Sequence, residues 1–251
     1  MVAGLLLGVA VAQPAAAAPK WALSANPNRS GSNFTDLTGV ACPSPNSCFA
    51  VGYDTTAART KSLVKHWNGS SWAIMRSLDP KRSASTNLTA VSCPSVKSCF
   101  AVGSYTIAHN PRTLAEHWNG KSWAIMSTIN PNHSASTVLN GVSCPSPKSC
   151  FAVGTYTAGA KSLTLVEHWN GAFWGIMRTP NPNHSKATAL DGVSCPTTKS
   201  CFAVGTVTLG ASAGSLVEHW NGSSWSIMRI FNPKNAIVKG FCPMVAEISP
   251  F

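Results

Sequence analysis

The chain has 251 residues, of which 44% are hydrophobic and 11% are charged, a composition typical of a globular protein with a buried core. Its formal net charge is +11, from 19 Lys and Arg residues against 8 Asp and Glu residues. This excess favours anionic partners such as cell-wall polymers, acidic glycans or membranes. The basic residues are scattered, with no run longer than the Lys81-Arg82 pair, whereas a nucleic-acid interface needs them clustered on one face. The composition therefore argues against specific nucleic-acid binding.

The N-terminus has the features of an export signal. Residues 2–11 form a short apolar stretch, and residues 15–18 are four alanines that suit a signal peptidase. The stretch is shorter than the ~20 residues that span a bilayer. No Lys or Arg precedes it, so the signal is atypical or the true start lies upstream. We expect cleavage after Ala17 and a secreted or cell-wall-associated protein that does not span the membrane.

A repeat of 51 residues governs the rest of the chain. The interval separates Cys42 from Cys93 and Trp67 from Trp118, and it continues without a shift through four copies. A fixed period of this length indicates a repeat architecture. A residue that recurs in every copy is more readily explained by the scaffold than by catalysis.

Eight of the nine cysteines form four identical pairs with five residues between the partners. In an exported protein such pairs predict disulfides, whereas structural zinc sites usually have two to four residues between paired cysteines. We therefore expect four disulfides and neither a metal nor a cofactor. The predicted pairs are Cys42 with Cys48, Cys93 with Cys99, Cys144 with Cys150, and Cys195 with Cys201, which leaves Cys242 without a partner.

Each repeat contains four strand candidates, which the third copy illustrates. Residues 139–144 and the β-branched, aromatic run 150–157 are the first two, separated by a turn with two prolines. Residues 162–169 form the third and end at an Asn-Gly turn signal, and residues 173–178 form the fourth. Four short antiparallel strands in about 50 residues match a blade of a β-propeller, such as a kelch blade. The sequence predicts an all-β, propeller-like array whose tryptophans pack between blades.

The motifs of the repeat resemble those of secreted repeat proteins of high-GC Gram-positive bacteria. These proteins carry L-x-G-V-S-C, C-x-A-V-G and L-x-E-H-W-N-G-x-x-W, which residues 190–225 show in order. The resemblance covers nearly all of the mature chain. It implies a secreted, propeller-like fold and brings no particular activity.

The period divides the chain into seven segments. They are a signal peptide (1–17), a partial blade with an outer strand (18–36), blade 1 (37–87), blade 2 (88–138), blade 3 (139–189), blade 4 (190–239) and the start of a further blade (240–251). The motif stops after Cys242, and Ile248 stands where the partner cysteine would be. We expect a truncated piece of a larger propeller, with closure into four blades as the alternative.

A histidine recurs before the first tryptophan of each pair, with a glutamate before it in three copies. The histidines are His66, His117, His168 and His219, and the glutamates are Glu116, Glu167 and Glu218, with Lys65 in the first copy. Alternation along a strand places Glu and His on opposite faces, so they cannot form an adjacent dyad. We expect the histidines to bond a neighbouring strand and the glutamates to form inter-blade salt bridges or a solvated edge.

The sequence gives little support to the hypothesis that the protein is an enzyme. Glycoside hydrolysis normally needs two carboxylates that flank the bond, and the remaining acids lie in no recognisable catalytic motif. Those acids are Asp36, Asp54, Asp79, Asp191 and Glu247. The repeat-equivalent arginines Arg76, Arg178 and Arg229, with Ser127 in the second copy, form no evident sialidase triad. A sialidase- or kelch-like hydrolase or lyase remains an alternative, as does a fragment without function.

Binding is the stronger hypothesis. Lys97, Lys148 and Lys199 recur inside the disulfide-clipped loops, with Asn46 in the first copy. Blades around an axis would place these lysines as a partial basic ring on one face, suited to an anionic cell-wall polymer or glycan. The alternative is that they only keep the loops soluble. An open array would also expose apolar blade faces, so we expect that self-association is possible.

Overall fold

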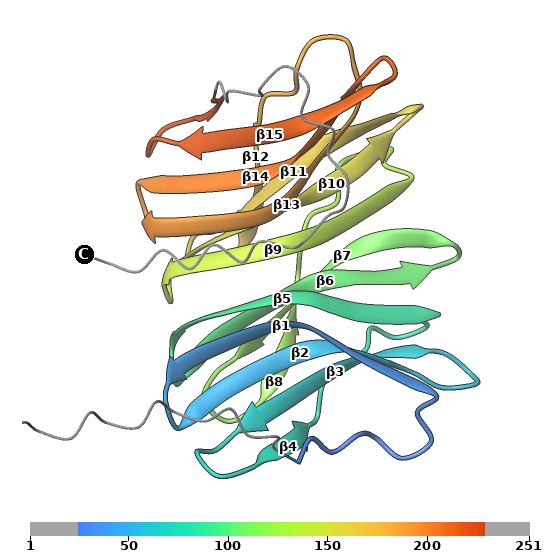
Figure 1. The fold of residues 1–251 in the computed structure, drawn as a ribbon, viewed down its shortest axis with the longest axis vertical. Coiled ribbons are helices and arrows are strands. Elements are labelled where there is room, and N and C mark those ends of the chain that lie inside the picture. The colour runs from blue at the N-terminus through green and yellow to red at the C-terminus, as the bar shows by residue number, and fades with distance from the viewer. Residues whose placement is uncertain (1–24, 229–251) are drawn as a thin grey trace, which may run out of the picture.

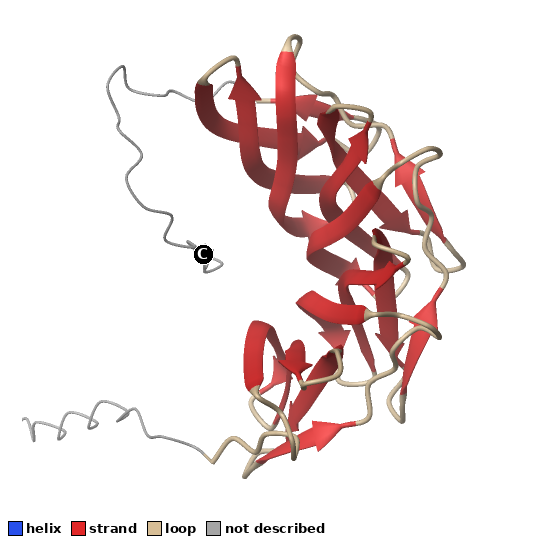
Figure 2. Ribbon diagram, turned by 90° about the vertical axis from the view of Figure 1, so that its right-hand side faces the viewer, coloured by secondary structure: helices blue, strands red, loops and turns tan. Residues whose placement is uncertain are grey.

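The computed structural model describes residues 25–228, which contain sixteen strands and no helix (Figures 1 and 2). The prediction of an all-β fold is thus confirmed. Within these residues no helix is long and apolar enough to cross a membrane. The expected signal peptide, Arg229, Cys242, Glu247, Ile248 and the further blade lie outside the described residues.

The strands form four blades of four strands each. Blade 1 contains β1 (Phe34–Ser44), β2 (Ser47–Thr55), β3 (Thr60–Trp67) and β4 (Trp72–Met75). Blade 2 contains β5 (Ser85–Ser95), β6 (Ser98–Ile107), β7 (Asn110–Trp118) and β8 (Trp123–Met126). Blade 3 contains β9 (Ser136–Ser146), β10 (Ser149–Ala158), β11 (Lys161–Trp169) and β12 (Trp174–Met177). Blade 4 contains β13 (Ser185–Thr197), β14 (Ser200–Leu209), β15 (Ser212–Trp220) and β16 (Trp225–Ile227).

Neighbouring strands within a blade are antiparallel, as the turn signals predict. In blade 3, β10 pairs with β9 and β11, and β11 pairs with β12 across the turn at Gly171. The first strands begin earlier than the period suggests. β9 starts at Ser136 rather than at Leu139, because β10 extends to Ala158 and supplies pairing partners for residues 136–138.

The blades form an open, curved array (Figure 2). Backbone strand pairing between blades is sparse, since blades 1 and 2 share one parallel residue pair, Thr60 with Ser85. Blades 3 and 4 share one as well, Ser162 with Ala187. Phe202 and Val204 of blade 4 are exposed, whereas the equivalent residues of blades 1 to 3 are buried against the next blade, so the described residues form an incomplete, propeller-like array rather than a closed four-bladed ring.

Side chains between adjacent blades make the core. At each of the three interfaces a phenylalanine from the second strand of one blade packs against the tryptophan pair of the next. Phe100 of blade 2, for example, lies 6.0 Å from Trp169 and 6.2 Å from Trp174, measured between ring centroids. The predicted role of the tryptophans is confirmed.

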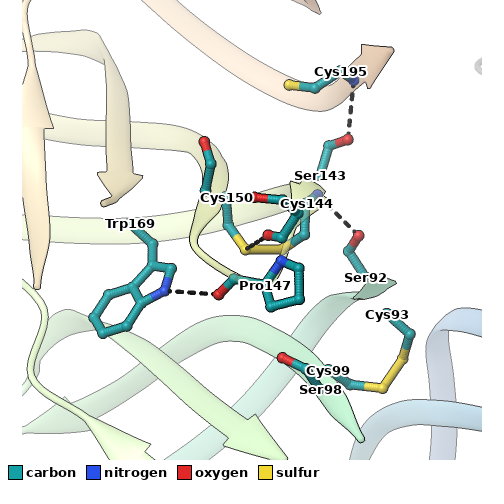
Figure 3. Close-up of a disulfide and its surroundings, with 12 residues drawn as sticks. Ser92, Cys93, Ser98, Cys99, Ser143, Cys144, Pro147, Cys150, Trp169 and Cys195 are labelled. Atoms are coloured by element: carbon teal, nitrogen blue, oxygen red, sulfur yellow. Dashed lines mark hydrogen bonds between the residues drawn. A yellow bond between two sulfur atoms is a disulfide. The ribbon is translucent and has the colours of Figure 1, made fainter. Parts of the chain in front are cut away.

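The four predicted disulfides are confirmed. They join Cys42 to Cys48, Cys93 to Cys99, Cys144 to Cys150, and Cys195 to Cys201. Each disulfide closes the turn between the first two strands of its blade. Four disulfides are consistent with an extracellular protein. Figure 3 also shows that the first strands are tied together, because the backbone N–H of Cys144 donates to Ser92 Oγ at 3.0 Å and that of Cys195 to Ser143 Oγ at 3.0 Å.

Candidate functional site: a lysine edge and two arginine grooves

The three recurrent lysines occupy equivalent turns. Lys97 lies in the turn from β5 to β6, Lys148 in that from β9 to β10, and Lys199 in that from β13 to β14. All three side chains are exposed. Successive blades therefore present them along one edge, which we call the lysine edge.

Each lysine turn is held by its own blade. The tryptophan at the end of the third strand donates its indole N–H to the turn, as Trp169 does to the carbonyl of Pro147 at 3.3 Å (Figure 3). The Asn-Gly turn to the fourth strand supports the lysine stem. Gly171 has φ +94°, and a methyl group built there would lie 3.3 Å from Cβ of Lys148. The ammonium groups thus extend from a rigid base that a disulfide, an indole and a glycine hold together.

Two grooves open beside the same turns. The first lies between blades 1 and 2 and has a volume of about 270 Å³. Blade 1 contributes Met75, Arg76 and Leu78, and blade 2 contributes Trp118, Lys121, Ser122 and Trp123. Gly120, against which the stem of Lys97 rests, directly precedes Lys121 and Ser122. Arg76 and Lys121 line the groove from its two blades, and the side chains of Arg76, Lys97 and Lys121 are all exposed.

The second groove repeats the first between blades 3 and 4. It has a volume of about 840 Å³ and is lined by residues 176–181 of blade 3 and by Trp220, Ser223, Ser224 and Trp225 of blade 4. Arg178 stands where the first groove has Arg76, and Lys199 rests on Gly222 as Lys97 rests on Gly120. We call the two the arginine grooves.

The interface between blades 2 and 3 lacks this chemistry. Ser127 stands at the arginine position, and Phe173 replaces the serine of the other two interfaces. Phe173 is 61% exposed, and the stem of Lys148 rests on Gly171 of the same turn. The sequence shows the equivalence of Arg76 and Arg178, but it does not show that the groove forms with tryptophans of the following blade.

The recurrent glutamates face the blade interfaces. Glu116 shares a strand face with Leu114 and Trp118, both of which belong to the interface with blade 1. Glu116, Glu167 and Glu218 are fully buried and form no salt bridge among the described residues. The expectation of salt bridges or a solvated edge is wrong, because alternation along the strand directs these side chains into the packed interface between blades.

Burial raises the pKa of all three carboxyl groups. Desolvation, with a smaller contribution from the charge of Asp79, raises the pKa of Glu116 to about 8. Desolvation raises the pKa of Glu167 and of Glu218 to about 7. At neutral pH the glutamate nearest the first groove therefore does little to neutralise Arg76 and the lysines. Lys65, the counterpart in blade 1, instead donates to Asn26 at 2.7 Å and Asn28 at 3.1 Å.

The histidines bond a neighbouring strand, as predicted. His168 Nε2 lies 3.0 Å from Ser149 Oγ in β10, and its ring lies 4.5 Å from that of Phe151. Repeat-equivalent bonds join His66 to Ser47, His117 to Ser98 and His219 to Ser200. Among residues 25–228 no three His, Cys, Asp or Glu side chains are grouped so that they could hold a metal ion. The histidines thus belong to the packing between strands.

Comparison with solved structures supports the propeller-like fold. The chain is similar to a polysaccharide lyase of family PL25, an ulvan lyase, with a TM-score of 0.54 and 10% identity over 78% of this chain and 54% of that one. It therefore spans about half of the lyase. Further matches are a family 117 glycoside hydrolase from Zobellia galactanivorans (TM-score 0.47, 6% identity, 82% and 72% of the two chains) and a GH74 xyloglucanase from Xanthomonas campestris (0.46, 14%, 75% and 30%). No family model and no curated protein sequence matches the chain.

Proposed function

We propose that the protein is a secreted, non-catalytic β-propeller-type module that binds anionic polysaccharide, such as a cell-wall polymer, along the lysine edge and in the arginine grooves. The observation that carries the proposal is the repetition of one cationic groove at two blade interfaces. Each groove combines an exposed arginine of one blade with two polar side chains of the next, Lys121 and Ser122 in the first groove and Ser223 and Ser224 in the second.

The chemistry of these groups suits an acidic chain. A guanidinium binds a carboxylate or phosphate through paired N–H groups, and a lysine adds a point charge at an exposed, adaptable position. Hydroxyls such as those of Ser223 and Ser224 can bond to sugar oxygens. Two grooves that are two repeats apart, with Lys148 between them, offer contacts to a long polymer rather than to a single small molecule.

Four of the seven acids of the described residues are fully buried, which favours binding over catalysis. Glu116, Glu167 and Glu218 are buried in the interfaces between blades, where a glycosidic bond cannot reach them. Asp54 is buried and paired with Arg29 at 2.7 Å. A pair of accessible carboxylates that flank a bond, which glycoside hydrolysis normally needs, would have to come from other residues.

The chain itself supplies the substitutions for a test. Arg76→Ser and Arg178→Ser give the first and second grooves the serine that the middle interface has naturally. Lys97→Asn, Lys148→Asn and Lys199→Asn copy the asparagine of the first repeat. Lys161→Gln is the control, because it removes one exposed charge at the opposite end of its blade, where β11 begins.

Binding to teichoic acid and polygalacturonate, with dextran as a neutral polymer, is measured by calorimetry at low and high salt. We expect wild-type binding to the two anionic polymers that weakens with salt, because screening acts on exposed charges. The double arginine variant should lose roughly tenfold in affinity, or about 1.4 kcal/mol, and the triple lysine variant a similar amount. Lys161→Gln should bind as wild type. Binding that is indifferent to salt, equal for dextran, or equally weakened by Lys161→Gln would overturn the proposal, as would cleavage of the bound polymer.

A further inference from the structure

The last blade has an apolar face that no described residue covers. Phe202 is 40% exposed and Val204 is 51% exposed. The repeat-equivalent side chains in the other blades are at most 1% exposed, because the next blade packs against them. The equivalents are Phe49, Phe100 and Phe151, and Val51, Val102 and Val153. We call the surface of Phe202 and Val204 the trailing face.

The first blade has the complementary face partly open. Leu37 is 37% exposed and Val40 is 63% exposed, whereas the equivalent leucines of the other blades are fully buried. Leu37, Val40 and Trp72 also line a cavity of about 630 Å³, to which blade 2 contributes Ala90 and Val91, whereas Ala50 at its base is buried. We call this surface the leading face. Asn26 and Asn28 cover its buried Lys65, so the part of the face near β3 already has polar partners.

The two open faces are the two halves of a contact that the chain forms three times. In each internal interface the trailing phenylalanine lies between 5.5 and 6.2 Å from both tryptophans of the next leading face, measured between ring centroids. Phe202 is the equivalent phenylalanine of blade 4, and no described tryptophan pair packs against it. Trp67 and Trp72 are the tryptophan pair of blade 1, and no described phenylalanine of a preceding blade packs against them.

A polar contact of the internal interfaces is also available. Ser92 and Ser143 each accept a hydrogen bond from the backbone N–H of a cysteine in the next blade. Ser194 is their equivalent in blade 4, and it is exposed. The backbone N–H of Cys42 is the equivalent donor in blade 1.

The geometry points to head-to-tail association, in which the leading face of a second copy of this chain packs on the trailing face of the first. Because the two faces differ, the contact is heterologous, and each copy retains one free face until a ring closes or a filament grows. This inference is independent of the proposed polysaccharide binding, which uses the lysine edge and the arginine grooves.

The test uses two variants of the full chain that each disable one face. Phe202→Glu places a charge on the trailing face, and Val40→Glu places one on the leading face. Both positions are exposed, so folding should be unaffected, and thermal unfolding of the isolated variants checks this. Ile125→Glu is the matched control, because Ile125 is 40% exposed on β8, away from both end faces.

Mass is measured by sedimentation and light scattering up to roughly 100 μM, where an interface with a micromolar Kd is saturated. We expect wild type and Ile125→Glu to associate, and Phe202→Glu and Val40→Glu each to remain monomeric. A mixture of the two variants should form a dimer and nothing larger, since together they have one intact face of each kind. The association should persist at high salt, which separates it from polysaccharide binding.

A wild-type chain that stays monomeric would overturn the inference and assign the trailing face to other residues of the same chain or to another partner. Association that survives in Phe202→Glu, or a variant mixture that stays monomeric, would overturn it as well.

Discussion

Phe49 of blade 1 meets Trp123 of blade 2 edge-on, with ring centroids 5.6 Å apart and ring planes at 80°. The same pair of positions recurs at each later interface, as Phe100 with Trp174 and Phe151 with Trp225. An edge-to-face pair is a favourable aromatic geometry and adds to the area that both rings bury. These contacts, rather than backbone hydrogen bonds, hold one blade to the next.

Truncating an interfacial phenylalanine should therefore destabilise the protein strongly. We expect Phe100→Ala to lower the free energy of unfolding by about 3–5 kcal/mol, because it leaves a cavity between blades 2 and 3. Phe202→Ala removes the same side chain where it is 40% exposed, and should cost far less in the monomer. Urea denaturation at low protein concentration measures both. Equal losses would contradict the unequal burial of the two rings.

The buried glutamates predict that stability falls as pH rises. The pKa of Glu116 is raised from its ordinary 4.5 to about 8, so between these values the folded chain holds a proton that the unfolded chain has released. The free energy of unfolding should therefore decline from pH 4.5 towards pH 8. We expect Glu116→Gln to flatten this decline and to raise stability at pH 8. Denaturation at several pH values measures the free energy of unfolding of both proteins.

The control for this prediction is Lys186→Gln, which alters an exposed charge and should leave the shape of the pH profile unchanged. A Glu116→Gln profile as steep as that of wild type would show that the proton is bound elsewhere.

The disulfides should each make a modest and local contribution. Cys93 and Cys99 are six residues apart, so their bond closes a short loop. The chain-entropy model assigns such a loop about 2 kcal/mol. We expect the double variant Cys93→Ser, Cys99→Ser to lose about that much stability and to keep the strand content of wild type in circular dichroism. A loss of all folded structure would mean that the bond does more than constrain its turn.

A glycine in each second strand allows a close approach of the first strand. A methyl group at Gly103 would lie 2.0 Å from the carbonyl oxygen of Asn87, next to an irregularity in the pairing of β5 with β6. We expect Gly103→Ala to cost roughly 3 kcal/mol, because backbone must shift to relieve the clash. Gly175→Ala is the comparison, since its nearest neighbour would be the ring of Phe173 at 3.7 Å. The midpoint of thermal unfolding separates the two.

The sequence predicts the blades well because their signals are local. The pairing of Cys144 with Cys150 follows from spacing and compartment, and the turn at Gly171 follows from the Asn-Gly dipeptide. The burial of Glu116 was missed because residue type favours an exposed position. Alternation with Leu114 and Trp118 could have revealed the face, but the partner surface comes from the preceding blade. For the same reason the position of Arg76 beside the tryptophans of blade 2 could not be predicted, because it depends on how far one sheet is shifted against the next.

Adjacent blades share very few backbone pairs, namely Thr60 with Ser85 and Ser162 with Ala187, and this affects how the molecule opens. With so little shared backbone pairing, each blade is coupled chiefly to its immediate neighbours, and stability resembles a sum of repeat and nearest-neighbour contributions. Blades 2 and 3 each have two such neighbours within the described chain, and blades 1 and 4 have one. Amide hydrogen exchange should therefore be graded, with the slowest protons in β6 and β10 and faster exchange in β2 and β14. Capping either end should slow exchange first in the blade beside the cap.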